Sequence, residues 1–96
     1  MIRHICMFKL KEKNKEVNIR AFVEKAGAII PLPQVRKAQV VTNAQGAPES
    51  NYDVCLIFDF DCLKDLEDYQ VHPVHQNFVK FVGTIRESRA NIDIEI

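Results

Sequence analysis

The chain has 96 residues, of which 13 are basic, 13 are acidic and 47% are apolar. This length supports one hydrophobic core, so we expect a single domain over residues 1–96, small enough to gain stability by pairing with a second copy. Balanced charge gives no general attraction for nucleic acid or an anionic membrane, and no apolar stretch approaches the length of a membrane span. Without a signal-peptide pattern at the start, we expect no nucleic-acid or membrane partner and a cytoplasmic location.

The first third of the chain predicts a strand followed by a helix. Residues 2–10 alternate, which places five side chains on one face: Ile2, His4, Cys6, Phe8 and Leu10. From about Asn14 the apolar residues recur at spacings of three and four, as on an amphipathic helix: Ile19, Phe22, Val23, Ala26 and Ile30. Pro31 and Pro33 then end the helix.

The middle of the chain predicts two strands joined by a loop. Residues 35–42 form a weakly patterned strand, and Gly46 and Pro48 mark a loop over residues 43–51. A strongly alternating strand follows over residues 52–60, with one apolar face: Tyr52, Val54, Leu56, Phe58 and Phe60.

The last third predicts helical segments and a final strand. Asp61 can cap a helix that carries Leu63, Leu66 and Tyr69. After a break at His72 and Pro73, a second apolar stripe indicates a further helix: Val74, Phe78, Phe81, Val82 and Ile85. Residues 89–96 then alternate as a strand that ends the chain.

This order, β-α-β-β-α-β, predicts an α+β fold of the ferredoxin-like, split βαβ type, in which helices cover one face of a four-stranded antiparallel sheet. The open face should be polar if water covered it, yet it presents four apolar side chains: Ile5, Met7, Cys55 and Ile57. We therefore expect a homodimer in which two open faces pack together and close a dimeric α/β barrel.

A cluster of histidines follows Tyr69. Pro73 suits the first position of a helix, and His72 and His75, three residues apart, then share roughly one face with Tyr69 on the same side. Two imidazoles and a phenol could converge here. Cys6, Cys55 and Cys62 are odd in number and lie in or beside apolar runs, which favours free thiols over disulfides or a zinc site.

The sequence resembles the stress-responsive dimeric α/β barrel (Dabb) family over nearly its whole length. The resemblance rests on residues 1–11, Ile30-Pro31, Tyr52-Asp53-Val54, the segment from Tyr69 to His75 with its Tyr-x-x-His-Pro-x-His pattern, Val82 and Asp93. It implies a homodimer with a small cavity in each subunit, between sheet and helices, that holds a small, partly apolar ligand.

The resemblance also implies site residues. In a plant polyketide cyclase of this family, residues matching Tyr69 and His75 carry the chemistry. By that likeness, His75 would remove a proton from a carbon next to a carbonyl, and Tyr69 would donate a hydrogen bond to the oxygen where charge develops. The candidate ligand-binding residues are His4, Cys6, Phe8, Ile19, Val23, His72 and Phe78. Ile19, Val23 and Val54 stand where the cyclase has aromatic residues or a histidine, so its substrate is not carried over.

Three alternatives stay open from the sequence. The same residues can be structural in a non-catalytic, stress-related homodimer, with His72 capping a helix, His75 bonding a backbone carbonyl and Tyr69 packed in the core. A monooxygenase of the same barrel superfamily is another, although the absence of tryptophan argues against it. A metal site of His4, His72 and His75 lacks a nearby carboxylate, so we expect no metal and no cofactor.

Two further expectations concern the buried space. An imidazole at His4, on the helix-covered face of a strand, needs a partner, which we expect to be His75, Tyr69 or a buried water. A cavity of about 300 Å³ or more that reaches His75 would favour ligand binding, whereas a core filled by phenylalanine side chains would favour the structural alternative.

Overall fold

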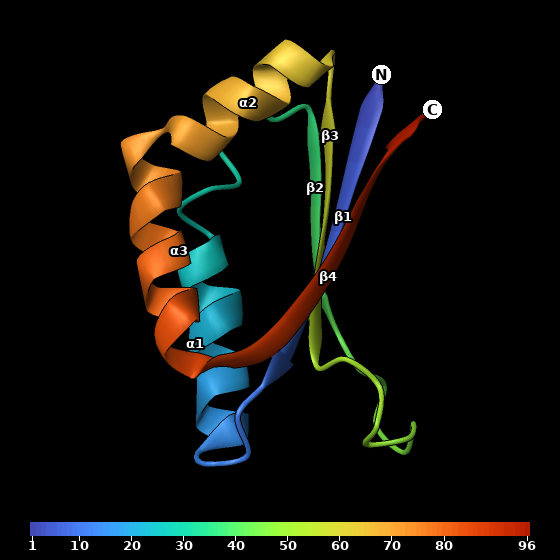
Figure 1. Ribbon diagram of the computed structural model, residues 1–96, viewed down its shortest axis with the longest axis vertical. Coiled ribbons are helices and arrows are strands. Elements are labelled where there is room, and N and C mark those ends of the chain that lie inside the picture. The colour runs from blue at the N-terminus through green and yellow to red at the C-terminus, as the bar shows by residue number, and fades with distance from the viewer.

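The computed structural model describes all 96 residues as a four-stranded sheet with a layer of helices on one face (Figure 1). The strands are antiparallel in the order β2-β3-β1-β4 and span β1 (Ile2–Leu10), β2 (Lys37–Thr42), β3 (Val54–Phe60) and β4 (Arg86–Glu95). The helices are α1 (Lys15–Ala26), α2 (Leu63–Val71) and α3 (Pro73–Ile85). The predicted ferredoxin-like fold is confirmed, with two separate helices between β3 and β4 where the predicted order counted one.

The central strands β1 and β3 follow the predicted alternation closely. Along β1, every second residue from Ile2 to Leu10 is buried under the helices, and the residues between them are half-buried on the other face. Pairing of His4 with Phe58 and of Cys6 with Leu56 aligns the buried faces of the two strands. Period-two alternation therefore places one imidazole, that of His4, in the middle of the helix-covered layer.

Aromatic rings fill most of the space between the sheet and α1. Phe22 of α1 lies with its ring centroid 5.2 Å from that of Phe8 and 5.1 Å from that of Phe78. Toward α2, the Tyr69 ring packs 5.0 Å from Phe60 and 5.9 Å from Phe58. This continuous core fixes the positions of α1, α2 and α3 on the sheet.

Helix α1 ends earlier than its apolar spacing predicts. It stops at Ala26, and the next hydrogen bonds join residues three apart, from Gly27 N–H to the Glu24 carbonyl and from Ile29 N–H to the Ala26 carbonyl. These tighter turns change the phase of the chain, so that Ile29 is buried and Ile30 is exposed. The prediction that Ile30 continues the apolar stripe was wrong for this reason.

The break between α2 and α3 is built around His72. Its backbone is extended, with φ −62° and ψ 135°, and Pro73 begins α3. The Nδ1 atom of His72 accepts a hydrogen bond from the Val74 N–H at 3.1 Å, which caps α3. By contrast, Asp61 does not cap α2: Cys62 occupies that position without a side-chain bond, and the Asp61 carboxylate pairs with Arg36 at 3.0 Å.

Strand limits differ from the sequence pattern at three places. Strands β2 and β3 begin two residues later than predicted, at Lys37 and Val54. Strand β4 begins three residues earlier, at Arg86, directly after α3, because Arg86 already pairs with Leu10 of β1. The additional residues at the start of β4 bring new side chains beside the helix layer.

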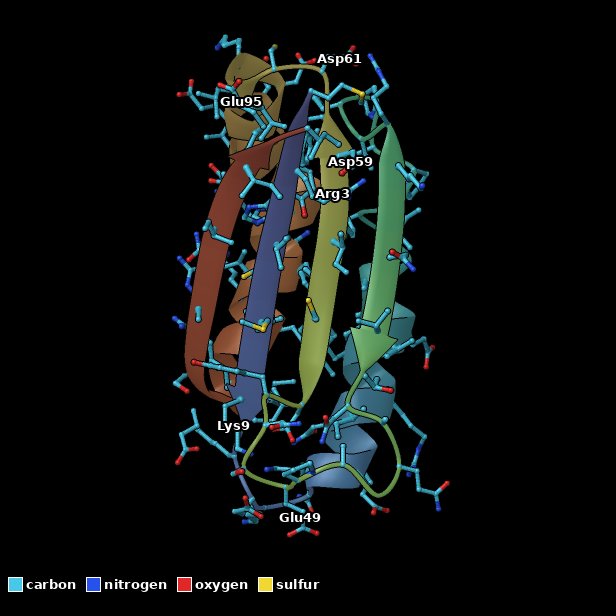
Figure 2. All side chains as sticks on the ribbon, turned by 90° about the vertical axis from the view of Figure 1, so that its right-hand side faces the viewer. Arg3, Lys9, Glu49, Asp59, Asp61 and Glu95 are labelled. Atoms are coloured by element: carbon cyan, nitrogen blue, oxygen red, sulfur yellow. The ribbon has the colours of Figure 1, made fainter.

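The open face of the sheet has an apolar centre and charged ends (Figure 2). Its centre contains the four predicted residues, which are half-buried within one chain, together with Ile92, which is 58% exposed. Arg3 and Asp59 form a two-point ion pair near one end, at 2.8 and 3.0 Å, and Lys9 lies at the other end. None of the helices combines the length and the apolar content needed to cross a membrane.

Candidate functional site

A cavity of about 80 Å³ lies between the sheet and the α2–α3 segment. Six of the predicted site residues line it: His4, Cys6, Phe8, Tyr69, His75 and Phe78. The other three lie outside it. His72 is turned to its capping role, Ile19 is partly buried against the core on α1, and Val23 is 41% exposed. These three residues therefore do not form part of the cavity wall, contrary to the prediction.

His75 is half-buried and held by one ring nitrogen. Its Nδ1 lies 3.0 Å from the backbone carbonyl oxygen of Gln70. Because a carbonyl oxygen only accepts hydrogen bonds, Nδ1 carries the proton and Nε2 keeps a free lone pair in the neutral ring. Burial lowers the pKa of His75 from its ordinary value of 6.5, although the Gln70 bond opposes this. His75 is thus prepared to accept a proton at Nε2.

Tyr69 is fully buried, and its ring centroid lies 4.4 Å from that of His75. Burial raises the pKa of the Tyr69 phenol, so the group stays protonated and acts as a hydrogen-bond donor. Gln34 Oε1 is the one buried side-chain polar atom that lacks a partner in this structure. The Tyr69 hydroxyl makes no hydrogen bond to the protein, yet it is not one of the buried atoms without a partner. It therefore borders the open space of the cavity.

His4 has a different partner from the three that we expected. Its Nδ1 lies 2.5 Å from Oδ1 of Asp93, the residue directly opposite it on β4. The carboxylate accepts from Nδ1, which fixes the ring and leaves Nε2 without a protein partner. Asp93 belongs to the pattern that carries the family resemblance, but nothing in its local sequence marked it as the partner of His4.

Cys6 also lines the cavity but is a poor nucleophile. Burial raises the pKa of its thiol to about 11, so the thiol is protonated at neutral pH. The histidines, cysteines and acidic residues form no group of three or more that could hold a metal ion. The chemistry that the cavity residues themselves support is proton transfer by imidazole beside a phenol donor.

Strand β4 supplies lining residues that the sequence analysis did not predict: Arg86, Arg89 and Asn91. The sequence alternation predicted a strand here but did not say which of its two faces the helices cover. The strand pairing provides the missing signal. Arg89 lies opposite Phe8 and Asn91 opposite Cys6, so both share the helix-covered face of the sheet.

The cavity is smaller than the volume of about 300 Å³ that we expected to favour ligand binding. Its volume of about 80 Å³ corresponds to roughly two or three water molecules. Two of the structural contacts that we considered are also present, because His72 caps α3 and His75 bonds a backbone carbonyl. Any ligand that enters completely must therefore be compact.

Solved structures of similar fold come from several organisms. A dimeric protein of unknown function and ferredoxin-like fold from Bacteroides fragilis is 31% identical, with a TM-score of 0.87 over 99% of this chain and 95% of that one. A Dabb family protein from Mesorhizobium loti is 22% identical, with a TM-score of 0.83 over 99% and 95% of the two chains. A hydroxynitrile lyase from Passiflora edulis is 17% identical, with a TM-score of 0.82 over 99% and 92%.

Among curated proteins, none matches the sequence significantly. The model of the Dabb family, described as the stress responsive A/B barrel domain, matches residues 2–96. That match includes every element of the sheet and the helix layer, together with all of the residues that line the cavity. The chain therefore belongs to the stress responsive A/B barrel (Dabb) domain family.

Proposed function

We propose that this protein is a homodimer that binds a small, partly apolar carbonyl compound in the cavity of each subunit and catalyses proton transfer at the carbon next to the carbonyl. Three polar atoms carry the proposal: the Tyr69 hydroxyl and the Nε2 atoms of His4 and His75. None of these atoms has a hydrogen-bond partner in the protein, and none is fully buried. Their side chains line one cavity. A core that used these groups only for packing would satisfy them internally.

In the proposed reaction, Nε2 of His75 accepts the proton from carbon. The electron pair of the broken C–H bond forms a carbon–carbon double bond, and the carbonyl π electrons move to oxygen. Tyr69, protonated because burial raises its pKa, donates a hydrogen bond to that oxygen. The Gln70 carbonyl, which already accepts from Nδ1 of His75, stabilises the imidazolium that forms. A hydroxynitrile lyase from Passiflora edulis has a similar fold, so this fold can carry an enzyme.

The proposed dimer forms through the open face of the sheet. Apolar side chains that one chain leaves half-buried on β1 and β3, or exposed on β4, gather on this face, and a second copy is the simplest cover for a self-complementary sheet face. The Bacteroides fragilis protein, 31% identical, is described as dimeric. Since the cavity opens on the other side of the sheet, dimer formation leaves it accessible.

A non-catalytic, stress-related dimer is the second candidate function. It is favoured by the small cavity and by the caps and backbone bonds that His72 and His75 make. The two candidates differ in what they require of the free polar atoms. Only the first needs the Tyr69 hydroxyl and Nε2 of His75.

A thermal-shift screen of small ketones and aldehydes tests the proposed function. We expect ligands that stabilise the wild type to lose their effect on His75→Ala, because the imidazole that contacts them is gone. His72→Asn is the matched control, since it removes an imidazole outside the cavity and keeps a good helix cap. Stabilisation that persists in His75→Ala would contradict the assigned site.

Tyr69→Phe separates the two candidates further. The hydroxyl has no protein partner, so its removal should change the free energy of unfolding by less than about 0.5 kcal/mol. Deuterium exchange at the carbon next to the carbonyl of a bound ligand should nevertheless fall, by about 100-fold or more. Unchanged exchange, or a large loss of stability, would favour the structural role.

A further inference from the structure

The cavity wall formed by β4 is charged, although it faces the buried side of the sheet. Arg89 lies opposite Phe8, and Asn91 lies opposite Cys6, in the middle of the strand pair. On its other face the same strand carries Ala90, Ile92 and Ile94. An ordinary edge strand directs its apolar residues toward the helices and its polar residues away from them. Strand β4 does the reverse and presents guanidinium groups to the cavity.

Neither arginine at the cavity has an acidic partner. Arg3 pairs with Asp59, and Arg36 pairs with Asp61, but Arg86 and Arg89 make no ion pair and no side-chain hydrogen bond. No aspartate or glutamate lines the cavity, and the carboxylate nearest in the pairing scheme, that of Asp93, is bonded to His4. Two permanent positive charges therefore border a site whose lining residues include no carboxylate, and the Asp93 carboxylate beside it is already paired with His4.

These charges act inside the cavity as well as on its rim. The positive charge of Arg89 contributes to lowering the pKa of His75, and Arg89 and Arg86 both oppose the rise in the pKa of the Cys6 thiol. Burial is the main cause of the lowered pKa of His75, and the charge of Arg89, which adds to it, also favours an anion in the cavity. A negatively charged ligand would gain from this field in both its resting and its enolate forms.

The shape of the site separates a charged end from an uncharged end. The exposed lining residues come from α2 and α3 on one side and from β4 on the other, so the cavity opens between α3 and β4. Arg86 and Arg89 lie at this opening, whereas Tyr69 and Phe78 are buried within. The planar guanidinium fork matches a carboxylate in two-point contact.

We propose that the cavity selects a compact carboxylate-bearing carbonyl compound, with the carboxylate held at the opening by Arg86 and Arg89 and the carbonyl directed inward to Tyr69 and His75. This inference rests on the proposed function and names its substrate class. The carboxylate stays partly hydrated, and only the few remaining atoms need the volume of about 80 Å³. Size and charge thus select the same kind of molecule.

The test compares pyruvate with pyruvamide, which has the same number of non-hydrogen atoms and no charge. Affinity is measured by NMR titration of the folded protein, with the His75 ring signals as the reporter. We expect pyruvate to bind about tenfold or more tightly than pyruvamide, since charge-assisted bonds to the arginines are available only to the carboxylate. The preference should decrease as salt is added, because both arginines are exposed.

Arg86→Gln combined with Arg89→Gln should erase the preference and leave pyruvamide binding unchanged. Both side chains are exposed and unbonded, so the double variant should fold normally, which its circular dichroism checks. Arg20→Gln is the matched control, because Arg20 is an exposed arginine on α1 that does not line the cavity. It should retain the full preference for pyruvate.

The outcomes separate this inference from the proposed function. Equal binding of the two compounds, a preference that survives in the double variant, or no binding of either compound overturns the carboxylate site. Exchange of the pyruvate methyl protons for deuterium tests the proposed catalysis separately, since it requires His75 to remove and return a proton. Preferential binding of pyruvate without exchange would leave the carboxylate site standing and overturn the catalysis.

Discussion

The two faces of the sheet share one alternating pattern but differ in what covers them. The face toward the helices buries large side chains such as Phe58 and Phe60, and it encloses a polar hollow around His4. The other face has smaller apolar residues at its centre, such as Ile5 and Ile57, with no cover from the chain itself (Figure 2). One face has enough helix to form a core, and the other is the face through which we propose that a second copy binds.

This difference shows how a chain of 96 residues can support both a core and a site. Polar groups on the helix-covered face lie where β4 and the α2–α3 segment meet, while the α1 side is closed by phenylalanine rings in tilted and edge-on contact. Stabilisation by a dimer through the open face would allow the covered face to leave a hollow unfilled. We therefore expect substitutions on the two faces to have different effects.

The largest effect should come from Ile57→Asp at the centre of the open face. A carboxylate there would be buried without a partner in the dimer, which should weaken association by at least about 100-fold. Sedimentation equilibrium measures the change in mass. Val71→Asp is the control, because Val71 is 69% exposed on α2, outside the sheet. An unchanged mass for Ile57→Asp would refute the open-face interface.

Next in size is Phe22→Ala, on the helix-covered side. Its ring is completely buried between Phe8 and Phe78, so truncation should cost about 3–5 kcal/mol in the free energy of unfolding. Chemical denaturation measures this loss. Val17→Ala, at an exposed position of the same helix, should cost less than about 0.5 kcal/mol. Similar losses in the two variants would show that the α1 side is not the packed core described here.

A smaller effect concerns acid stability at one end of the open face. Arg3 holds the pKa of Asp59 below its usual value of 3.8 in the folded protein. The folded pKa is lower than the unfolded one, so the stabilisation is complete above about pH 3.8 and is lost as the pH falls through the folded pKa. Denaturation curves against pH should show this loss in the wild type and not in Asp59→Asn. Identical acid profiles for the two proteins would contradict the role of this ion pair.

Much of the fold follows from the sequence because its signals are local. Strict alternation identifies β1 and β3, and Pro73 after His72 identifies the start of α3. The errors arise where longer-range contacts decide the outcome. Helix α1 stops at Ala26 because the following turns tighten, and β4 starts at Arg86 because Leu10 is available for pairing.

The site was predictable in part for the same reason. Tyr69, His75 and His4 line one cavity, as the spacing and the resemblance led us to expect. The partner of His4 could not be identified, since Asp93 lies 89 residues away and meets it only through strand pairing. Arg89 was missed because sequence alternation separates the two faces of an edge strand but does not say which one the helices cover.

The role of His75 as the proton acceptor depends on its protonation state, which can be measured. Nitrogen-15 NMR of the wild-type ring, followed by titration, reports both the tautomer and the pKa. We predict a neutral ring at pH 7 that is protonated at Nδ1, with a pKa below 6.5, because burial disfavours the charged form and the Gln70 carbonyl holds the Nδ1 proton. An imidazolium at pH 7, or a neutral ring protonated at Nε2, would contradict the assignment of His75 as the proton acceptor.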